Sequence, residues 1–537
     1  MRTARGVAGS LAGCAAAAAA LGAAELAAIA TGPRTSPLVA VGSVVVDTAP
    51  RPVVELAIRV FGAADRIALQ VGTIVLLAAA AAALGAAATR WWPVAPTALV
   101  AFAAVGVAAA VTRPGAGVAA AAPTVVGALA AGLTYALLHR RFISPPPRRP
   151  PGGPPQPSTG DAAAQVDAVT QVDAAAQVHD AHLARHTRRR LLRASAVVVA
   201  VAAVTGLVGR YLATVRGVSQ AREDLTLPPP ADPAPPVPPG AELAVPGLAS
   251  YVTANDRFYR VDTALVIPQV DPRQWRLRIH GRVRRPYTLT FRELLDQPMV
   301  ERYLTLTCVS NPVGGPLIGN ARWLGVPVAD LLAEAGPLPG ADQVVSRSVD
   351  GWTCGTPTSV LMDGRDALLA VAMNGEPLPP EHGFPVRMVV PGLYGYVSAC
   401  KWISEIELSS FDDFDAYWVR RGWAPRAPIK TQSRIDTPRE RAAAGTVTVA
   451  GVAWAQHRGI ARVEVRIDDG PWQEATLADT VSADTWRQWS LRWEATPGPH
   501  RLTVRATDAD GVTQPEEPSP AAPDGATGWH TVDLEVV

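Results

Sequence analysis

Cysteine is scarce in this chain of 537 residues, which contains four cysteines and no Cys-x-x-Cys pair. This scarcity excludes a disulfide scaffold, and the missing motif excludes a zinc knuckle and a c-type haem attachment site. The sequence also has no histidine-rich tract. The formal net charge is only +2, so no global field argues for nucleic-acid binding. Disulfide-rich, c-type haem and nucleic-acid-binding classes are therefore excluded.

Charged residues are nearly absent from four alanine-rich runs at the start of the chain. These runs cover residues 7–30, 67–89, 94–112 and 117–138. Each approaches the roughly 20 apolar residues that a bilayer-spanning helix requires. A soluble buried helix is the alternative for any single run, but four in succession favour a membrane domain over residues 1–138. The amphipathic stretch 51–66 is expected to lie at the membrane interface.

Arginines flank the apolar runs and predict their orientation. They precede the first run at Arg2 and Arg5, and they follow the fourth at Arg140, Arg141, Arg148 and Arg149. By the positive-inside rule, the N-terminus and the linker 139–187 are cytoplasmic. The linker combines a proline-rich stretch with a short QVDA repeat, a composition that cannot bury a core.

A further apolar segment, residues 188–215, begins with three consecutive arginines. The sequence TRRRLLR (187–193) resembles a twin-arginine export signal, and the apolar run after it is short. An ordinary fifth membrane span with positive flanks is the alternative. Both interpretations place the residues after about 216 outside the cytoplasm.

The exported half begins after a proline-rich linker, residues 216–245. Residues 246–425 mix strand and helix signals, which predicts an α+β domain with a mixed sheet. The expected strands are 275–281, 287–291, 303–309 and 385–390, and the expected helices are 291–297 and 328–336. From about residue 444 the pattern is nearly pure strand with hydrophobic alternation, which predicts that residues 426–537 form an all-β, immunoglobulin-like sandwich.

One cysteine in the exported half stands at an unusual place. Cys308 ends an apolar-alternating run, directly before a loop rich in proline and glycine. A buried cysteine that packs as a small hydrophobic residue is the usual alternative, and we favour it for Cys14, Cys354 and Cys400. The spacing does not support a disulfide between the last two. For Cys308, a nucleophile would need a nearby base.

A metal-ligand role for Cys308 depends on which metal is considered. A zinc site needs three or four protein ligands, and the sequence has no such cluster. A soft metal that brings most of its own sulfur ligands would need only one protein thiolate. Molybdenum held by a pterin dithiolene is such a metal.

The sequence around Cys308 resembles the sulfite oxidase family of molybdopterin enzymes. The similarity runs over about residues 250–537 and includes the C-terminal sandwich, which resembles the family's dimerisation domain. The most specific block is HGFPVR…VPG…KW together with the upstream cysteine. The matching pieces are NDRFYRV (255–261), WRLRIHGRV (275–283), LTCVSN (306–311), ARWLGVPVADLL (321–332) and NGEPLPPEHGFPVRMVVPGLYGYVSACKW (374–402).

The resemblance implies roles for particular residues. It implies that Cys308 ligates molybdenum and that Arg260 lies near the substrate. The residues implied to contact the molybdopterin are Asn255, Phe258, Tyr259, Ser348 or Asp350, His382, Arg387, Ser398, Ala399 and Lys401. A planar guanidinium such as that of Arg387 can also bind a phosphate in a bidentate manner. The alternatives are a surface charge for Arg387, a loop position for His382 and a core position for Tyr259.

One departure from the family concerns the substrate. Sulfite oxidases carry basic residues just after the ligating cysteine, in a pattern like CxGNRR, whereas this chain has Pro312 and Val313 there. A sulfite dianion would therefore be less well compensated. The family also includes bacterial enzymes that reduce sulfoxides, including oxidised methionine in proteins.

The sequence thus predicts a multi-pass membrane protein with an exported molybdopterin oxidoreductase domain that catalyses two-electron oxygen-atom transfer. The expected substrate is sulfite or a related sulfur compound, and the alternative is a sulfoxide reductase. A separate cytochrome or quinone-linked carrier would exchange the electrons, since no haem is predicted in this chain. A homodimer through residues 426–537 is implied by the resemblance. The remaining alternative is a non-enzymatic, membrane-anchored binding protein.

Overall fold

The computed structural model describes residues 2–50, 53, 60, 65–113, 116–143, 189–212 and 218–537. Contacts divide the chain into two compact units, Met1–Arg216 and Gly217–Val537. Most of the predicted linker 139–187 and most of the amphipathic stretch 51–66 lie outside the described residues. Their predicted structure therefore stays a prediction, as does the start of the twin-arginine-like sequence.

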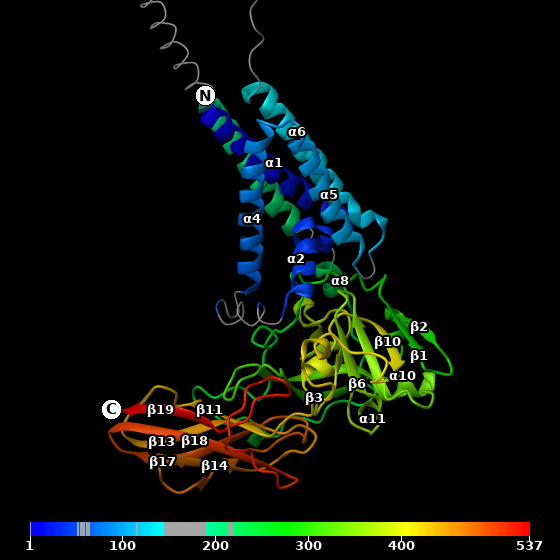
Figure 1. The fold of residues 1–537 in the computed structure, drawn as a ribbon. Helices are drawn as coiled ribbons and strands as arrows, with labels where there is room; N and C mark the ends of the chain where they lie inside the picture. Colours follow the sequence, from blue (N-terminus) through cyan, green and yellow to red (C-terminus); the bar gives the residue numbers. More distant parts are fainter. Residues whose placement is uncertain are drawn as a thin grey trace, which may run out of the picture. The chain divides into compact units, whose positions relative to one another are not determined.

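The first unit is a bundle of helices (Figure 1). Five helices in the described residues are long and apolar enough to cross a membrane. They include the four predicted runs and the helix Arg189–Leu212. Large apolar side chains such as Leu76, Val100 and Leu129 are exposed on the bundle, as expected for lipid-facing surfaces. The main helices are α1 (Arg2–Thr31), α2 (Pro37–Thr48), α4 (Asp65–Ala88), α5 (Val94–Val111) and α6 (Ala122–Leu138).

Glycines let α1 approach its neighbours closely. A Cβ atom added at Gly13 would lie 2.1 Å from the carbonyl oxygen of Ala81 in α4. One added at Gly22 would lie 2.7 Å from the carbonyl oxygen of Ala202 in the helix Arg189–Leu212. Such backbone proximity at small residues is how helices associate in a membrane, where lipid offers no hydrophobic drive between them.

The second unit begins with two sheets of five strands each. The first has the order β2-β1-β10-β5-β6, with strands Tyr287–Thr290, Arg276–Gly281, Ile403–Ser409, Gln343–Ser348 and Thr353–Pro357. Its β1–β10 pair is parallel and its other pairs are antiparallel. The second has the order β3-β4-β7-β8, with β9 on β7, and strands Val300–Thr307, Ile318–Pro327, Leu368–Met373, Glu376–Pro377 and Arg387–Val389.

Short helices connect these strands. The helix α9 (Phe291–Leu295) begins at a capping box in which Thr290 and Glu293 bond each other's backbone N–H. The helix α10 (Val328–Ala335) ends at Gly336, whose φ of 67° favours glycine. The four predicted strands, the two predicted helices and the mixed sheet of this region are confirmed.

The C-terminal region is rich in strands, as predicted. One sheet has the order β11-β13-β17-β16, with strands Gln432–Thr437, Gly445–Trp454, Arg487–Ala495 and Thr476–Leu477. The other has the order β12-β19-β18-β14-β15, with strands Arg441–Ala442, His530–Val536, Gly498–Asp508, Ile460–Ile467 and Gln473–Glu474. Both contribute to one apolar core that includes Val449, Trp489, Val465 and Leu502. Its immunoglobulin-like character stays a prediction.

The described part of the proline-rich segment 216–245 is hydrogen-bonded to the fold and is not a free tether. The Ala231 N–H donates to the Met299 carbonyl oxygen at 2.7 Å. Asp232 accepts from the Glu301 N–H at 2.9 Å and forms a parallel bridge with Val300. This segment therefore lies along the beginning of β3, the strand that leads to Cys308.

Candidate active site

Cys308 lies directly after the last residue of β3, Thr307. Its N–H donates to the Leu317 carbonyl oxygen at 3.0 Å, which closes the base of the loop that follows. The Sγ atom lies 3.0 Å from Oγ of Ser310. The residue is buried. Burial raises the pKa of the Cys308 thiol, while the Ser310 hydrogen bonds and the charge of Lys401 act in the opposite direction.

Four rings form an aromatic group next to this loop. Phe258 stacks on Tyr259 with ring centroids 5.3 Å apart, and it meets Trp323 and His382 edge to face at 5.8 and 5.6 Å. A Cβ atom at Gly319 of β4 would lie 2.7 Å from the Phe258 ring. Glycine at this position of the strand therefore makes room for the aromatic group.

The pKa of Tyr259 responds both to the Cys308 thiol and to a basic residue of the site. Burial raises its pKa, the charge of Cys308 acts in the same direction, and that of Arg387 acts against it. Its hydroxyl is therefore neutral and close enough to both groups to sense their charges.

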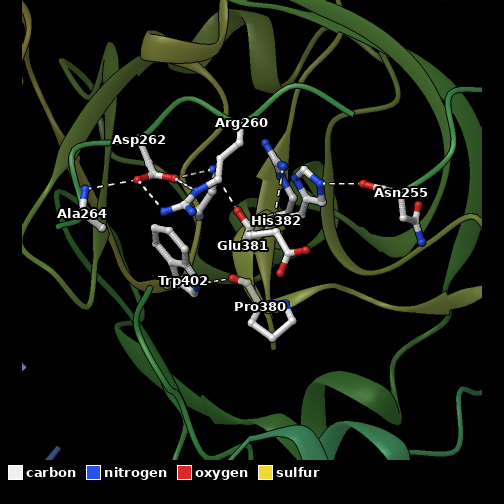
Figure 2. A network of polar contacts seen from close by, with 10 residues as sticks. Asn255, Arg260, Asp262, Ala264, Pro380, Glu381, His382 and Trp402 are labelled. Atoms are coloured by element: carbon white, nitrogen blue, oxygen red, sulfur yellow. Dashed lines mark hydrogen bonds and ion pairs between the residues drawn. The ribbon is translucent and has the colours of Figure 1, made fainter. Parts of the chain in front are cut away.

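His382 and Arg387 are buried and only partly hydrogen-bonded. His382 Nε2 lies 3.0 Å from the Asn255 carbonyl oxygen (Figure 2). Arg387 Nη1 donates to the His382 carbonyl oxygen at 3.2 Å, and its guanidinium lies over Trp323 at 5.1 Å. In the described part of the chain, His382 Nδ1 and Arg387 Nε have no hydrogen-bond partner. The described residues include other buried side-chain polar atoms without a partner, such as Gln456 Oε1, but these two lie on contacting residues of one site, which suggests that a bound group completes them.

Burial also lowers the pKa of both His382 and Arg387. It lowers the pKa of His382 to about 4, and the positive charges of Arg387 and Lys401 act in the same direction. It lowers the pKa of Arg387 to about 10. At neutral pH, His382 is therefore an uncharged imidazole beside two cations.

A buried carboxylate, Asp262, joins two further cations of the site (Figure 2). Lys401 Nζ donates to Asp262 Oδ2 at 2.9 Å and to the Glu381 carbonyl oxygen at 3.0 Å. Arg260 Nε donates to the same carboxylate oxygen at 2.9 Å, and the Ala264 N–H donates to Oδ1 at 3.2 Å. Burial lowers the pKa of Lys401 to about 8, against the raising effect of Asp262.

The other predicted contacts divide into two groups. Asn255 belongs to the site, because its Oδ1 accepts from Asn374 Nδ2 at 2.8 Å while its carbonyl oxygen lies against His382. Ser348 ends β5, and Asp350 Oδ1 accepts from the Trp352 N–H at 3.0 Å. The turn they form reaches the site through its backbone, since the Val349 N–H donates to the Trp402 carbonyl oxygen at 3.0 Å.

Ser398 and Ala399 lie in the turn just before Lys401. Ser398 Oγ donates to the Tyr394 carbonyl oxygen at 3.0 Å, and the Ala399 N–H donates to the Gly395 carbonyl oxygen at 2.9 Å. These hydrogen bonds of Ser398 and Ala399 stay within their own turn. The structure brings together the remaining predicted residues: Asn255, Phe258, Tyr259, Arg260, Cys308, His382, Arg387 and Lys401.

Sequence reasoning missed Asp262, Asn374 and the carbonyl of Glu381. The Arg260-Val-Asp262 spacing was a usable signal, because Asp271–Arg273 and Asp363–Arg365 form ion pairs at the same separation. Asn374 has a φ of 55° before Gly375, as an Asn-Gly turn predicts. The Glu381 carbonyl carried no sequence signal, since any residue supplies one.

The two other cysteines of this unit pack as predicted. Cys354 and Cys400 are free and fully buried, and burial, with a smaller contribution from the neighbouring Cys354, raises the pKa of the Cys400 thiol. The predicted packing role therefore holds for both of them in this structure.

Comparisons with known proteins indicate the kind of domain that contains Cys308. Residues 264–418 match the model of the oxidoreductase molybdopterin binding domain. Sulfite oxidase of Gallus gallus is 32% identical over 321 residues, which cover 50% of this chain and 69% of that protein. The uncharacterized oxidoreductase YuiH of Bacillus subtilis (strain 168) is 35% identical over 156 residues, which cover 29% of this chain and 75% of that protein.

One further relative matches over a smaller share of its own length, and one solved structure matches over a larger share. Mitochondrial sulfite oxidase of Mus musculus is 31% identical over 341 residues, and the chain spans 62% of it. Among solved structures, the sulfane dehydrogenase SoxCD of Paracoccus pantotrophus is 24% identical with a TM-score of 0.46, covering 53% of this chain and 83% of that chain.

The matched domain and these relatives define an oxidoreductase that uses a molybdenum cofactor. The chain belongs to the sulfite oxidase family of molybdopterin-dependent oxidoreductases.

Proposed function

We propose that this protein is a membrane-anchored oxidoreductase that transfers an oxygen atom to or from a sulfur compound at molybdenum. The main observation behind this proposal is a pair of buried atoms without hydrogen-bond partners, His382 Nδ1 and Arg387 Nε, in the same site as the Cys308 thiol. A thiolate suits a soft metal, and an unsatisfied guanidinium donor beside an unsatisfied imidazole acceptor suits a polar group such as the pterin. The donor set therefore fits this cofactor.

The residue roles follow from the contacts. Cys308 would ligate molybdenum, and its hydrogen bond to Ser310 favours the thiolate that ligation needs. Arg387 and Lys401 would bind the anionic part of the cofactor. The further residues proposed to hold the pterin are Asn255, Phe258, Tyr259, Ser348, Asp350, His382, Ser398 and Ala399.

The bound cofactor supplies the two-electron redox chemistry and the exchangeable oxygen. The chain supplies orientation and charge. The buried ring of Tyr259, stacked on Phe258, would limit the access of water to the thiol, and the neutral imidazole of His382 adds no charge beside Arg387. Tyr259 keeps its hydroxyl proton and can donate it in a hydrogen bond to a polar substrate.

Sulfite or a related sulfur compound is the first candidate substrate, in line with the relatives. The cation available to bind an anion there is Arg260, and it already forms an ion pair with Asp262 at 2.9 Å.

A sulfoxide is the second candidate, and a specific observation favours it. The side chains that interact with Cys308 include the uncharged Ser310, Tyr259 and Tyr394. The charged Lys401 also acts on Cys308, but it is already paired with Asp262. Pro312 and Val313 occupy the positions at which the family resemblance places basic residues. An uncharged polar substrate would need no compensating cation in such surroundings.

We further propose five membrane spans, with the N-terminus in the cytoplasm and the catalytic unit outside. The basic residues at the start of α1 and at the start of the helix Arg189–Leu212 support this orientation. The glycine contacts between Gly22 of α1 and this helix favour a permanent fifth span over a cleaved signal. A separate cytochrome or quinone-linked carrier would exchange electrons, and the C-terminal sheets would mediate a homodimer.

The test of this function is metal analysis of the full-length protein, produced in a host that makes the cofactor. We expect about one molybdenum per chain, with pterin fluorescence after oxidation. Cys308→Ser should keep the pterin and lose turnover, while the control Cys14→Ser in α1 should keep both. A folded wild-type chain without molybdenum would contradict the proposal.

Substrate assays separate the two candidates. Sulfite with an oxidised dye tests oxidation, and methionine sulfoxide with a reduced dye tests reduction. Turnover in the second assay alone would favour the sulfoxide reductase and reject sulfite.

A further inference from the structure

We propose that the C-terminal sheets position the Cys308 thiol, with Gln456 fixing the strand that leads into it and Arg434 fixing the loop that leaves it. This inference rests on the proposed role of Cys308 as the metal ligand. It gives the C-terminal region a function in the active site, in addition to any role in assembly.

Gln456 lies just after β13 and is fully buried. Its Nε2 donates to the Thr305 carbonyl oxygen and to Thr307 Oγ1, each at 3.1 Å. Thr307 is the residue that precedes Cys308. A single side chain of the C-terminal region thus holds the last three residues of β3 at two points.

Two backbone groups of the C-terminal region also hold the end of β3. The Thr305 N–H donates to the Asp484 carbonyl oxygen at 3.0 Å, and the Trp486 N–H donates to Thr305 Oγ1 at 2.8 Å. Because β4 pairs with the other edge of β3, the C-terminal residues satisfy polar groups that the sheet leaves unpaired.

Arg434 of β11 holds the loop on the other side of the thiol. Its Nη1 donates to the Gly315 carbonyl oxygen at 2.9 Å. Its Nε and Nη2 donate to Asp436 at 2.6 and 3.3 Å, and both side chains are buried. This bidentate ion pair fixes the guanidinium. Gly314 packs beside it against His530, where an added Cβ would lie 2.0 Å from the ring.

The loop between these anchors is short and closed on itself. The Cys308 N–H bonds the Leu317 carbonyl oxygen, and the Gly315 N–H bonds the Pro312 carbonyl oxygen at 2.9 Å. A shift at Gly315 is therefore transmitted to Cys308 through few bonds. His382, Arg387 and Lys401 lie on other segments, so losing an anchor should move the thiol without releasing the pterin.

The test compares two buried glutamines in the full-length protein. Gln456→Met removes the anchor at similar volume. Gln488→Met is the matched control, because Gln488 is equally buried but bonds the Leu243 N–H and the Ala249 carbonyl oxygen. Arg434→Met removes the second anchor, and Arg434→Lys keeps its charge and should partly rescue it.

The first readout needs no cofactor. In cofactor-free protein, the rate of Cys308 alkylation by iodoacetamide is measured by mass spectrometry of its peptide. We expect Gln456→Met and Arg434→Met to raise it about tenfold, the effect of one lost hydrogen bond, and Gln488→Met to leave it unchanged. Equal rates in all variants, or an equal rise in Gln488→Met, would overturn the inference.

The second readout uses the loaded protein. Pterin content should stay at the wild-type level in Gln456→Met, while the Mo(V) electron paramagnetic resonance spectrum changes and kcat falls with KM unchanged. Loss of pterin together with an unchanged alkylation rate would reject positioning of the thiol. If the wild-type chain holds no molybdenum, the proposed function fails, whereas the alkylation result still decides the inference.

Discussion

Lys401 and Asp262 form an ion pair of 2.9 Å in which both side chains are less than one tenth exposed. The same carboxylate also pairs with Arg260. Removing one partner of such a buried pair leaves an uncompensated charge, which is strongly unfavourable. Asp262 is therefore expected to set both the position and the charge of Lys401.

The variant Asp262→Asn tests this relationship. Without the carboxylate, the pKa of Lys401, already lowered to about 8 by burial, should fall further, so that a neutral amine binds the cofactor poorly. We expect pterin content per chain to fall about tenfold, measured by fluorescence after oxidation. Asp271→Asn is the control, because that aspartate pairs with an exposed Arg273. Equal pterin content in both variants would refute the role of Asp262.

Arg387→Lys should also weaken cofactor binding. A lysine keeps the charge but loses the planar guanidinium, which alone can offer the orphaned Nε and stack on Trp323. We expect about a tenfold loss of bound pterin. Arg365→Lys is the control, since this arginine bonds Asp363 and the Pro391 carbonyl oxygen. Wild-type affinity in Arg387→Lys would mean that the guanidinium does not contact the cofactor.

Acid should destabilise the second unit through two buried histidines. Burial lowers the pKa of His530 and of His382 to about 4 in each case. Between pH 6.5 and about 4, the unfolded chain therefore binds more protons than the folded chain. The stability is complete above pH 6.5 and is lost as the pH falls through this window, by at most about 3 kcal/mol per histidine.

His530→Asn isolates one of these contributions. The asparagine oxygen can replace Nδ1, which accepts from the Ile435 N–H at 3.0 Å, but it does not titrate. Thermal melting of cofactor-free protein at pH 7 and pH 5 should show a smaller acid loss than in the wild type. An unchanged acid loss would assign the effect to other groups.

Gly209→Leu should loosen the helix bundle. A Cβ atom there would lie 2.7 Å from the backbone of Glu25 in α1, whereas Gly72 in α4 has nothing within 4 Å. We expect the free energy of unfolding to fall by about 2 kcal/mol because of overpacking, seen as a lower melting temperature in detergent. Gly72→Leu should melt like the wild type.

A permanent fifth span also predicts that the N-terminal part of the chain stays attached. A protein tagged at both ends should keep both tags, and loss of the N-terminal tag would favour a cleaved signal.

The sequence by itself determined much of the local structure of this protein and predicted the residues of its candidate site. Hydrophobic runs of spanning length predicted the helices, because length and apolar character act residue by residue. Alternation predicted β1 and β3, and the resemblance around Cys308 and the HGFPVR block predicted the residues that the structure brings together.

Only the tertiary structure decided how distant residues combine. It placed Asp262 beside Lys401, 139 positions away, left atoms of His382 and Arg387 without partners, and set Gln456 and Arg434 against the two sides of Cys308. The physical reason is that hydrogen bonding, burial and charge pairing depend on distance in space, and no local pattern encodes which remote side chain will satisfy a buried group.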